Sequence, residues 1–125
     1  MNAISQARTA YSSTAAPTKT PRAVEYEVVA RVTNRLRQAA GTMQNDFAGL
    51  VQALYDNNAL WTIFAAAVSD ADNALPAELK GRIFYLAEFT RTHTSRILAG
   101  EAEVDPLLDV NAAIMAGLRG QGEAA

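Results

Sequence analysis

The sequence predicts an all-α protein, a small antiparallel bundle of four to five helices joined by short loops. Half of its 125 residues are hydrophobic, many of them alanine, and only 7% are aromatic. Apolar residues recur at helical spacing along several stretches, whereas no useful run alternates with the period of two that is typical of a strand. Proline, glycine, aspartate and asparagine separate these stretches, as expected where one helix ends and the next begins.

The chain is predicted to have three parts: an arm at 1–20, a helical bundle at 21–119 and a disordered tail at 120–125. Serine, threonine, alanine and glutamine dominate the arm. Ile4 and Tyr11 are its main apolar side chains, and such a weak stripe cannot hold an isolated helix. The arm is therefore expected to be either flexible or a short helix.

Capping residues predict where the helices begin and end. Pro21 and Pro76 suit first helical positions, because proline lacks the N–H group that a helix start leaves unbonded. Asn57 and Asn58 predict a kink or break, after which Asn58 caps the following helix. The expected helices cover residues 21–40, 42–57, 58–68, 76–99 and 105–118.

The stretch 60–79 joins two of these helices and contains the only tryptophan. Leu60 begins an apolar face with the spacing of a helix, and Trp61 is expected to anchor the core. Asp70 and Asn73 then favour a turn, because their side chains compete for backbone hydrogen bonds. This stretch is therefore predicted to be a corner of the bundle.

Charge is distributed unevenly along the chain, although the formal net charge is only −2. Residues 1–42 carry six basic and two acidic side chains, whereas residues 43–78 carry five acidic and no basic ones. The basic segment can lie beside acidic parts of the same fold or contact RNA through Arg31, Arg35 and Arg37. A pI of about 5.3 and the lack of an aromatic stacking platform argue against nucleic acid.

No catalytic, cofactor-binding or metal-binding residues are expected. The chain has no cysteine, and His93 is its only histidine, so no thiolate or histidine cluster can bind a metal. The acidic turn at 70–73 lacks the glycine and the distal glutamate of a calcium loop. His93 is expected to be a packed or solvent-facing polar residue. Neither a secretory signal nor a membrane span is visible, so a soluble cytoplasmic protein is expected.

One helix has more apolar surface than a single buried face requires. Tyr26, Val29 and Thr33 form a second partial stripe on the first bundle helix, and Ile4 and Tyr11 add to it from the arm. Two interpretations are open. The stripe either forms an oligomer contact or a groove that binds an amphipathic helix of a partner, or it places this helix near the centre of the bundle.

Three stretches resemble the FlaF family of alphaproteobacterial flagellar proteins, and the resemblance covers about residues 10–118. They are AYSSTAAPTKTPRAVEYE near the start, LWTIFAAAVSDADNALPAELKGRI in the middle and LLDVNAAIMAGL near the end. The residues that carry most of the resemblance are Leu60, Trp61, Asp70, Asn73, Leu75, Pro76, Asn111, Gly117 and Leu118.

The resemblance implies a flagellar assembly factor without enzymatic activity. FlaF proteins promote flagellin synthesis, oppose the translational repressor FlbT and are regarded as cytoplasmic chaperones that hold flagellin for export. The implied partner is therefore flagellin, through its amphipathic terminal helices, with FlbT as a second candidate. The alternative is an RNA-binding regulator of the flagellin message. Neither membrane nor nucleic acid is the expected partner.

Overall fold

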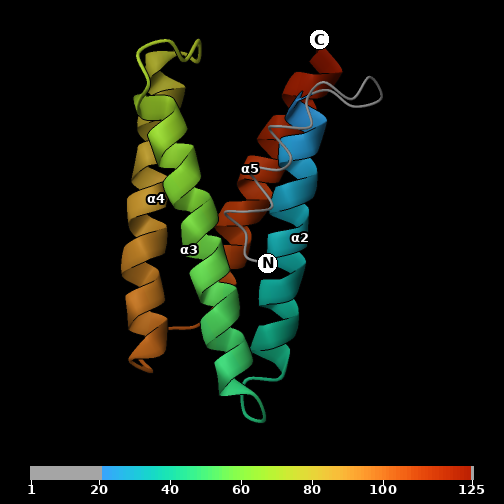
Figure 1. Cartoon of the computed structure of the whole chain (residues 1–125), viewed down its shortest axis with the longest axis vertical. Helices are drawn as coiled ribbons and strands as arrows, with labels where there is room; N and C mark the ends of the chain where they lie inside the picture. Colours follow the sequence, from blue (N-terminus) through green and yellow to red (C-terminus); the bar gives the residue numbers. More distant parts are fainter. Residues whose placement is uncertain (1–20, 125) are drawn as a thin grey trace.

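The chain is described by a computed structural model that covers the backbone of residues 21–124 and the side chains of residues 25–118. This part contains four helices and no strand, which confirms the all-α prediction. The expected arm at 1–20 lies outside the described residues. The helices are α2 (Pro21–Gly41), α3 (Phe47–Ser69), α4 (Ala77–Leu98) and α5 (Asp105–Ala124), so the last helix extends beyond its expected end at residue 118 (Figure 1).

The helices pack as two pairs, α3 with α4 and α2 with α5, and the pairs meet where α2 packs against α3. Helix α2 packs against α3 and α5, and α3 packs against α4, whereas α4 and α5 have little contact. Figure 1 shows the α3–α4 pair and the α2–α5 pair diverging toward the end where α2 begins and α5 ends. Helices α2 and α3 are therefore the two central helices, and α4 and α5 each pack mainly against one neighbour.

The expected break at Asn57 and Asn58 is wrong, because α3 is continuous through both residues. The side-chain oxygen of Asn57 accepts a hydrogen bond from Nδ2 of Asn111 at 2.8 Å. That of Asn58 accepts one from the hydroxyl of Thr94 at 3.1 Å. Since both side chains are bonded to other helices, they do not compete with the backbone of their own helix.

Helix α3 begins five residues later than its expected start. Asp46 is the N-cap, and its carboxylate accepts a hydrogen bond from the backbone N–H of Gly49 at 2.9 Å. A Cβ atom at Gly49 would lie 2.5 Å from Oδ2 of Asp46, so a larger residue would displace the capping side chain. The four preceding residues form a turn instead of a helical start.

The predicted corner between α3 and α4 is confirmed. Asp70 ends α3 in an extended conformation. The amide group of Asn73 donates to the carbonyl of Ala67 at 3.1 Å and accepts from the N–H of Leu75 at 2.9 Å. Pro76 is the N-cap of α4, so the helix begins one residue later than expected. These side-chain bonds fix the direction in which α4 leaves the corner.

Trp61 lies in the core, as expected, with 1% of its surface exposed. Its ring meets Phe64 edge to face, with ring centroids 5.4 Å apart. Its indole Nε1 donates to Oδ1 of Asn111 at 2.9 Å. The Nδ2 group of Asn111 in turn donates to Asn57 and, at 3.0 Å, to the hydroxyl of Thr33. One buried amide on α5 thus bonds to side chains on both α2 and α3.

Truncating Trp61 should destabilise the protein strongly. We expect Trp61→Ala to lower the free energy of unfolding by about 3–5 kcal/mol, because it removes a buried ring and leaves a cavity. Urea denaturation followed by far-UV circular dichroism measures this change. Tyr85→Ala is the control, since Tyr85 is 67% exposed and its loss should change stability by about 0.5 kcal/mol or less. Equal effects of the two variants would contradict this assignment.

The hydrogen bond between Trp61 and Asn111 predicts energetic coupling. Asn111→Leu keeps a similar volume but leaves the indole N–H and the Asn57 oxygen without this partner. Each unsatisfied group should lower the free energy of unfolding by about 1–3 kcal/mol. Trp61→Phe breaks the same bond from the other side. The double variant should therefore cost less than the two single variants together. Additive costs in a double-mutant cycle would show that the bond contributes little.

Candidate partner-binding surfaces

Of the two interpretations of the second stripe on α2, the structure favours a helix near the centre of the bundle, because Val29 and Thr33 lie inside it. Val29 and Thr33 are fully buried, and the hydroxyl of Thr33 donates to the carbonyl of Val29 at 2.7 Å. Tyr26 is half-buried against the same core cluster. Helix α2 needs two apolar faces because it packs on both α3 and α5. Binding through Tyr26 stays a prediction, and Ile4 and Tyr11 lie outside the described residues.

The exposed apolar surface lies on α3 and α4 instead. On α3, Phe47, Val51 and Tyr55 are spaced four residues apart and remain exposed, with Phe47 at 52% and Tyr55 at 55%. On α4, Phe84 and Leu98 are also exposed. Residues four apart on a helix share one face, so the three α3 side chains form one row. The sequence signal was the width of the apolar pattern on α3, which is too broad for one buried face.

A groove follows the seam between these two helices. It encloses about 550 Å³ between Tyr55 and Thr62 of α3 and Phe84, Glu88 and Arg91 of α4. Its floor consists of small side chains, Ala59, Ala65 and Ala87. The name α3–α4 groove is used below for this cavity together with three exposed side chains outside it, which are Phe47 and Val51 of the row on α3 and Leu98 of α4.

The length and lining of the α3–α4 groove suit a helical partner. Phe84, Arg91 and Leu98 are seven residues apart and so share one face of α4. From Phe84 to Leu98 this face extends over about 21 Å, the length of about four helical turns. Glu88 and Arg91 form an ion pair at 2.7 Å, and both side chains are mostly exposed. Such surface pairs contribute little and can rearrange when a partner binds.

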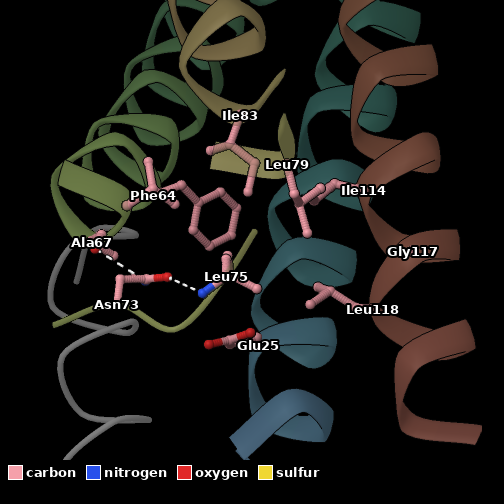
Figure 2. Close-up of a pocket in the computed structure, with 11 residues that line it drawn as sticks. Glu25, Phe64, Ala67, Asn73, Leu75, Leu79, Ile83, Ile114, Gly117 and Leu118 are labelled. Atoms are coloured by element: carbon pink, nitrogen blue, oxygen red, sulfur yellow. Dashed lines mark hydrogen bonds between the residues drawn. The ribbon is translucent and has the colours of Figure 1, made fainter. Parts of the chain in front are cut away.

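A second cavity lies at the end of the bundle where the helix pairs diverge (Figure 2). Its volume is about 130 Å³, and all four helices and the α3–α4 corner contribute to its lining. Glu25, Asn73 and Gly117 also border this cavity, which is called the end pocket below. Its larger apolar lining residues are Phe64, Leu75, Leu79, Ile83, Ile114 and Leu118.

The arginines that could contact RNA lie on the exposed side of α2. Arg31, Arg35 and Arg37 are exposed, and Nη1 of Arg37 donates to the side-chain oxygen of Asn34 at 2.8 Å. The large exposed aromatic side chains belong to α3 and α4, not to α2. Single-stranded RNA is usually bound by cationic and stacking aromatic side chains together. That nucleic acid is not a partner stays a prediction.

His93 is a packed residue, which is one of the two environments expected for it. It is buried, its ring stacks on Phe89 with centroids 5.2 Å apart, and its Nε2 lies 2.7 Å from the carbonyl oxygen of Glu103. It therefore ties α4 to the segment that leads into α5. Among the described residues, no group of three or more histidine, cysteine or acidic side chains is placed to bind a metal.

None of the four described helices is long and apolar enough to cross a membrane. The nine residues that carry the family resemblance lie mostly in the core and at the α3–α4 corner. Leu60, Trp61, Asn111 and Leu118 are buried, and Gly117 borders the end pocket beside Leu118. They therefore specify how the bundle is held together, and none of them lines the α3–α4 groove.

Comparison with known protein families matches residues 7–118 to the family described as flagellar protein FlaF. Neither a curated protein nor a solved structure matches the chain. The family match covers most of the chain, including α2, α3, α4 and the part of α5 up to residue 118. The protein therefore belongs to the FlaF family of flagellar proteins.

Proposed function

We propose that this protein is a non-enzymatic flagellar assembly factor that binds an amphipathic helix of flagellin in the α3–α4 groove. In this proposal it acts in the cytoplasm as an export chaperone and promotes flagellin synthesis. The observation that supports it most is the exposed row of Phe47, Val51 and Tyr55, which ends in the cavity lined by Phe84, in a member of a flagellar family. Exposed apolar rows of this kind are typical of surfaces that bind partners.

The reason for binding lies in the apolar surfaces of a flagellin terminal helix and of the α3–α4 groove. The terminal helices of flagellin form the core of the filament, so unpolymerised flagellin exposes an apolar stripe that favours aggregation. An amphipathic helix binds a groove through anchors at i, i+3, i+4 and i+7. On this protein, α3 offers three exposed apolar side chains at i, i+4 and i+8, and α4 adds Phe84 and Leu98. Bound in the groove, the stripe of flagellin would be shielded from other flagellin molecules.

The exposure of the anchors favours binding that can be reversed. About half of the surface of each exposed anchor is still accessible to water, so complete burial contributes only about 1 kcal/mol per residue. These anchors are Phe47, Val51, Tyr55, Phe84 and Leu98. Part of that gain offsets the loss of rotational and translational freedom. A chaperone must release flagellin for export, and a moderate affinity allows release without another energy source.

The regulatory role follows from occupancy of the same groove. Flagellin that has not been exported would fill the groove and lower the amount of free protein. In this proposal, only free protein promotes translation of flagellin, with the repressor FlbT as the candidate intermediary. Synthesis would then decline when export is blocked.

Charges placed in the groove should abolish flagellin binding without unfolding the protein. We expect Val51→Glu combined with Tyr55→Glu to weaken the affinity at least about tenfold, because a helix would have to bury carboxylates. Isothermal titration calorimetry with purified flagellin measures the dissociation constant. Tyr85→Glu is the matched control, since Tyr85 lies on α4 and does not line the groove. Wild-type affinity in the double variant would contradict the proposal.

Salt dependence separates groove binding from RNA binding. If three arginines contact the phosphates of single-stranded RNA, the affinity of the protein for that RNA should fall about 20-fold between about 50 and 200 mM salt. Apolar contacts in the groove should change little over that range. Fluorescence anisotropy measures the affinity of the protein for flagellin and for the flagellin message at each salt concentration. Steeply salt-dependent binding to the message, lost in Arg31→Ala with Arg35→Ala, would favour the RNA-binding alternative.

A further inference from the structure

The end pocket is an apolar space that the described residues do not fill. Its volume of about 130 Å³ is close to that of an engineered apolar cavity of about 150 Å³ that binds benzene. The ring of Phe64 and the side chains of Leu79 and Ile114 face this space (Figure 2). A space of this size and lining fits one aromatic ring.

The chain enters the bundle beside this pocket. Helix α2 begins at Pro21, and Glu25, about one turn further along, borders the pocket. The rise of a helix places Pro21 about 6 Å along the axis from Glu25. The connection to residues 1–20 therefore lies at the end of α2 that borders the pocket.

Only one side chain in residues 1–20 matches the pocket in size and shape. Tyr11 is the only aromatic residue among them, and most of its neighbours are small or polar. Tyr11 lies ten positions before Pro21, and an extended chain of that length reaches up to about 35 Å. Tyr11 can therefore reach the pocket without strain in the connecting segment.

We propose that the ring of Tyr11 docks in the end pocket, so that residues 1–20 fold back over this end of the bundle. The ring would pack against Phe64, Leu79 and Ile114, and its hydroxyl would face the open side near Asn73. Burial of the ring removes apolar surface from water on both sides of the contact. This inference assigns Tyr11 to its own bundle rather than to a partner, and it does not depend on flagellin binding.

Cysteine pairs test where the arm lies, because the chain contains no cysteine. The test pair is Ser12→Cys with Ala67→Cys, since Ala67 is exposed and borders the end pocket. The control pair is Ser12→Cys with Val51→Cys, which lies about 24 Å away along α3. Disulfide formation is followed by mass measurement under mild oxidation in the full-length monomer.

We expect the disulfide of the test pair to form about tenfold faster than that of the control pair. Tyr11→Ala should remove this difference in rate, and Tyr11→Phe should preserve it. Equal rates for both pairs, a faster control pair or no effect of Tyr11→Ala would each overturn the proposal. Disulfides between two molecules would overturn it as well, since they would place the arm on a second copy.

Filling the pocket provides an independent test. A Cβ atom at Gly117 would have no neighbour within 4 Å, so Gly117→Leu can place its side chain in the space that borders the pocket. We expect trypsin to cleave after Arg8 about tenfold faster in this variant, because the displaced arm is more accessible. Gly81→Leu is the control, since Gly81 is equally open and does not border the pocket. Unchanged cleavage in Gly117→Leu would contradict the docking of Tyr11.

Discussion

The amide of Asn111 is the interaction on which the arrangement of the helices depends. It accepts from Trp61 and donates to Asn57 and Thr33, so it joins α5 to both α3 and α2. Buried polar groups need partners, and these partners are present only when the three helices have this register. Apolar side chains of α3 and α5 also share the core clusters, and the hydrogen bonds of Asn111 fix how these two helices are aligned. Beyond this point the two helix pairs diverge, and the end pocket lies between them.

The central position of α2 explains why the apolar groove lies elsewhere. Helix α2 uses its apolar side chains on α3 and α5, including the stripe at Val29 and Thr33. Helix α3 also has two apolar rows, but only the row with Leu50 and Leu54 is buried. No described helix covers its second row, which begins at Phe47. The residues that hold the bundle together and the surface proposed to bind flagellin are therefore separate, and either can be changed without the other.

The sequence allowed the helical class, the core position of Trp61 and the α3–α4 corner to be predicted, because each depends on local chemistry. The continuity of α3 could not be predicted, because Asn57 bonds to a residue 54 positions away. Two asparagines in a row favour a break locally, and only the tertiary partners remove that preference. Similarly, the sequence of α2 revealed a second apolar stripe, but the second row of α3 was not distinguished from its first. Which row faces the core depends on the neighbouring helices and not on the pattern itself.

The central claim is that an amphipathic flagellin helix occupies the α3–α4 groove. Titrating the isotopically labelled protein with a peptide of a flagellin terminal helix, and following backbone amide resonances by nuclear magnetic resonance, tests it most directly. The account predicts that the largest shifts cluster on Val51, Tyr55, Phe84 and Leu98, with small changes around Asn111. Shifts confined to α2 or to the end pocket, or no shifts at a saturating concentration, would contradict it.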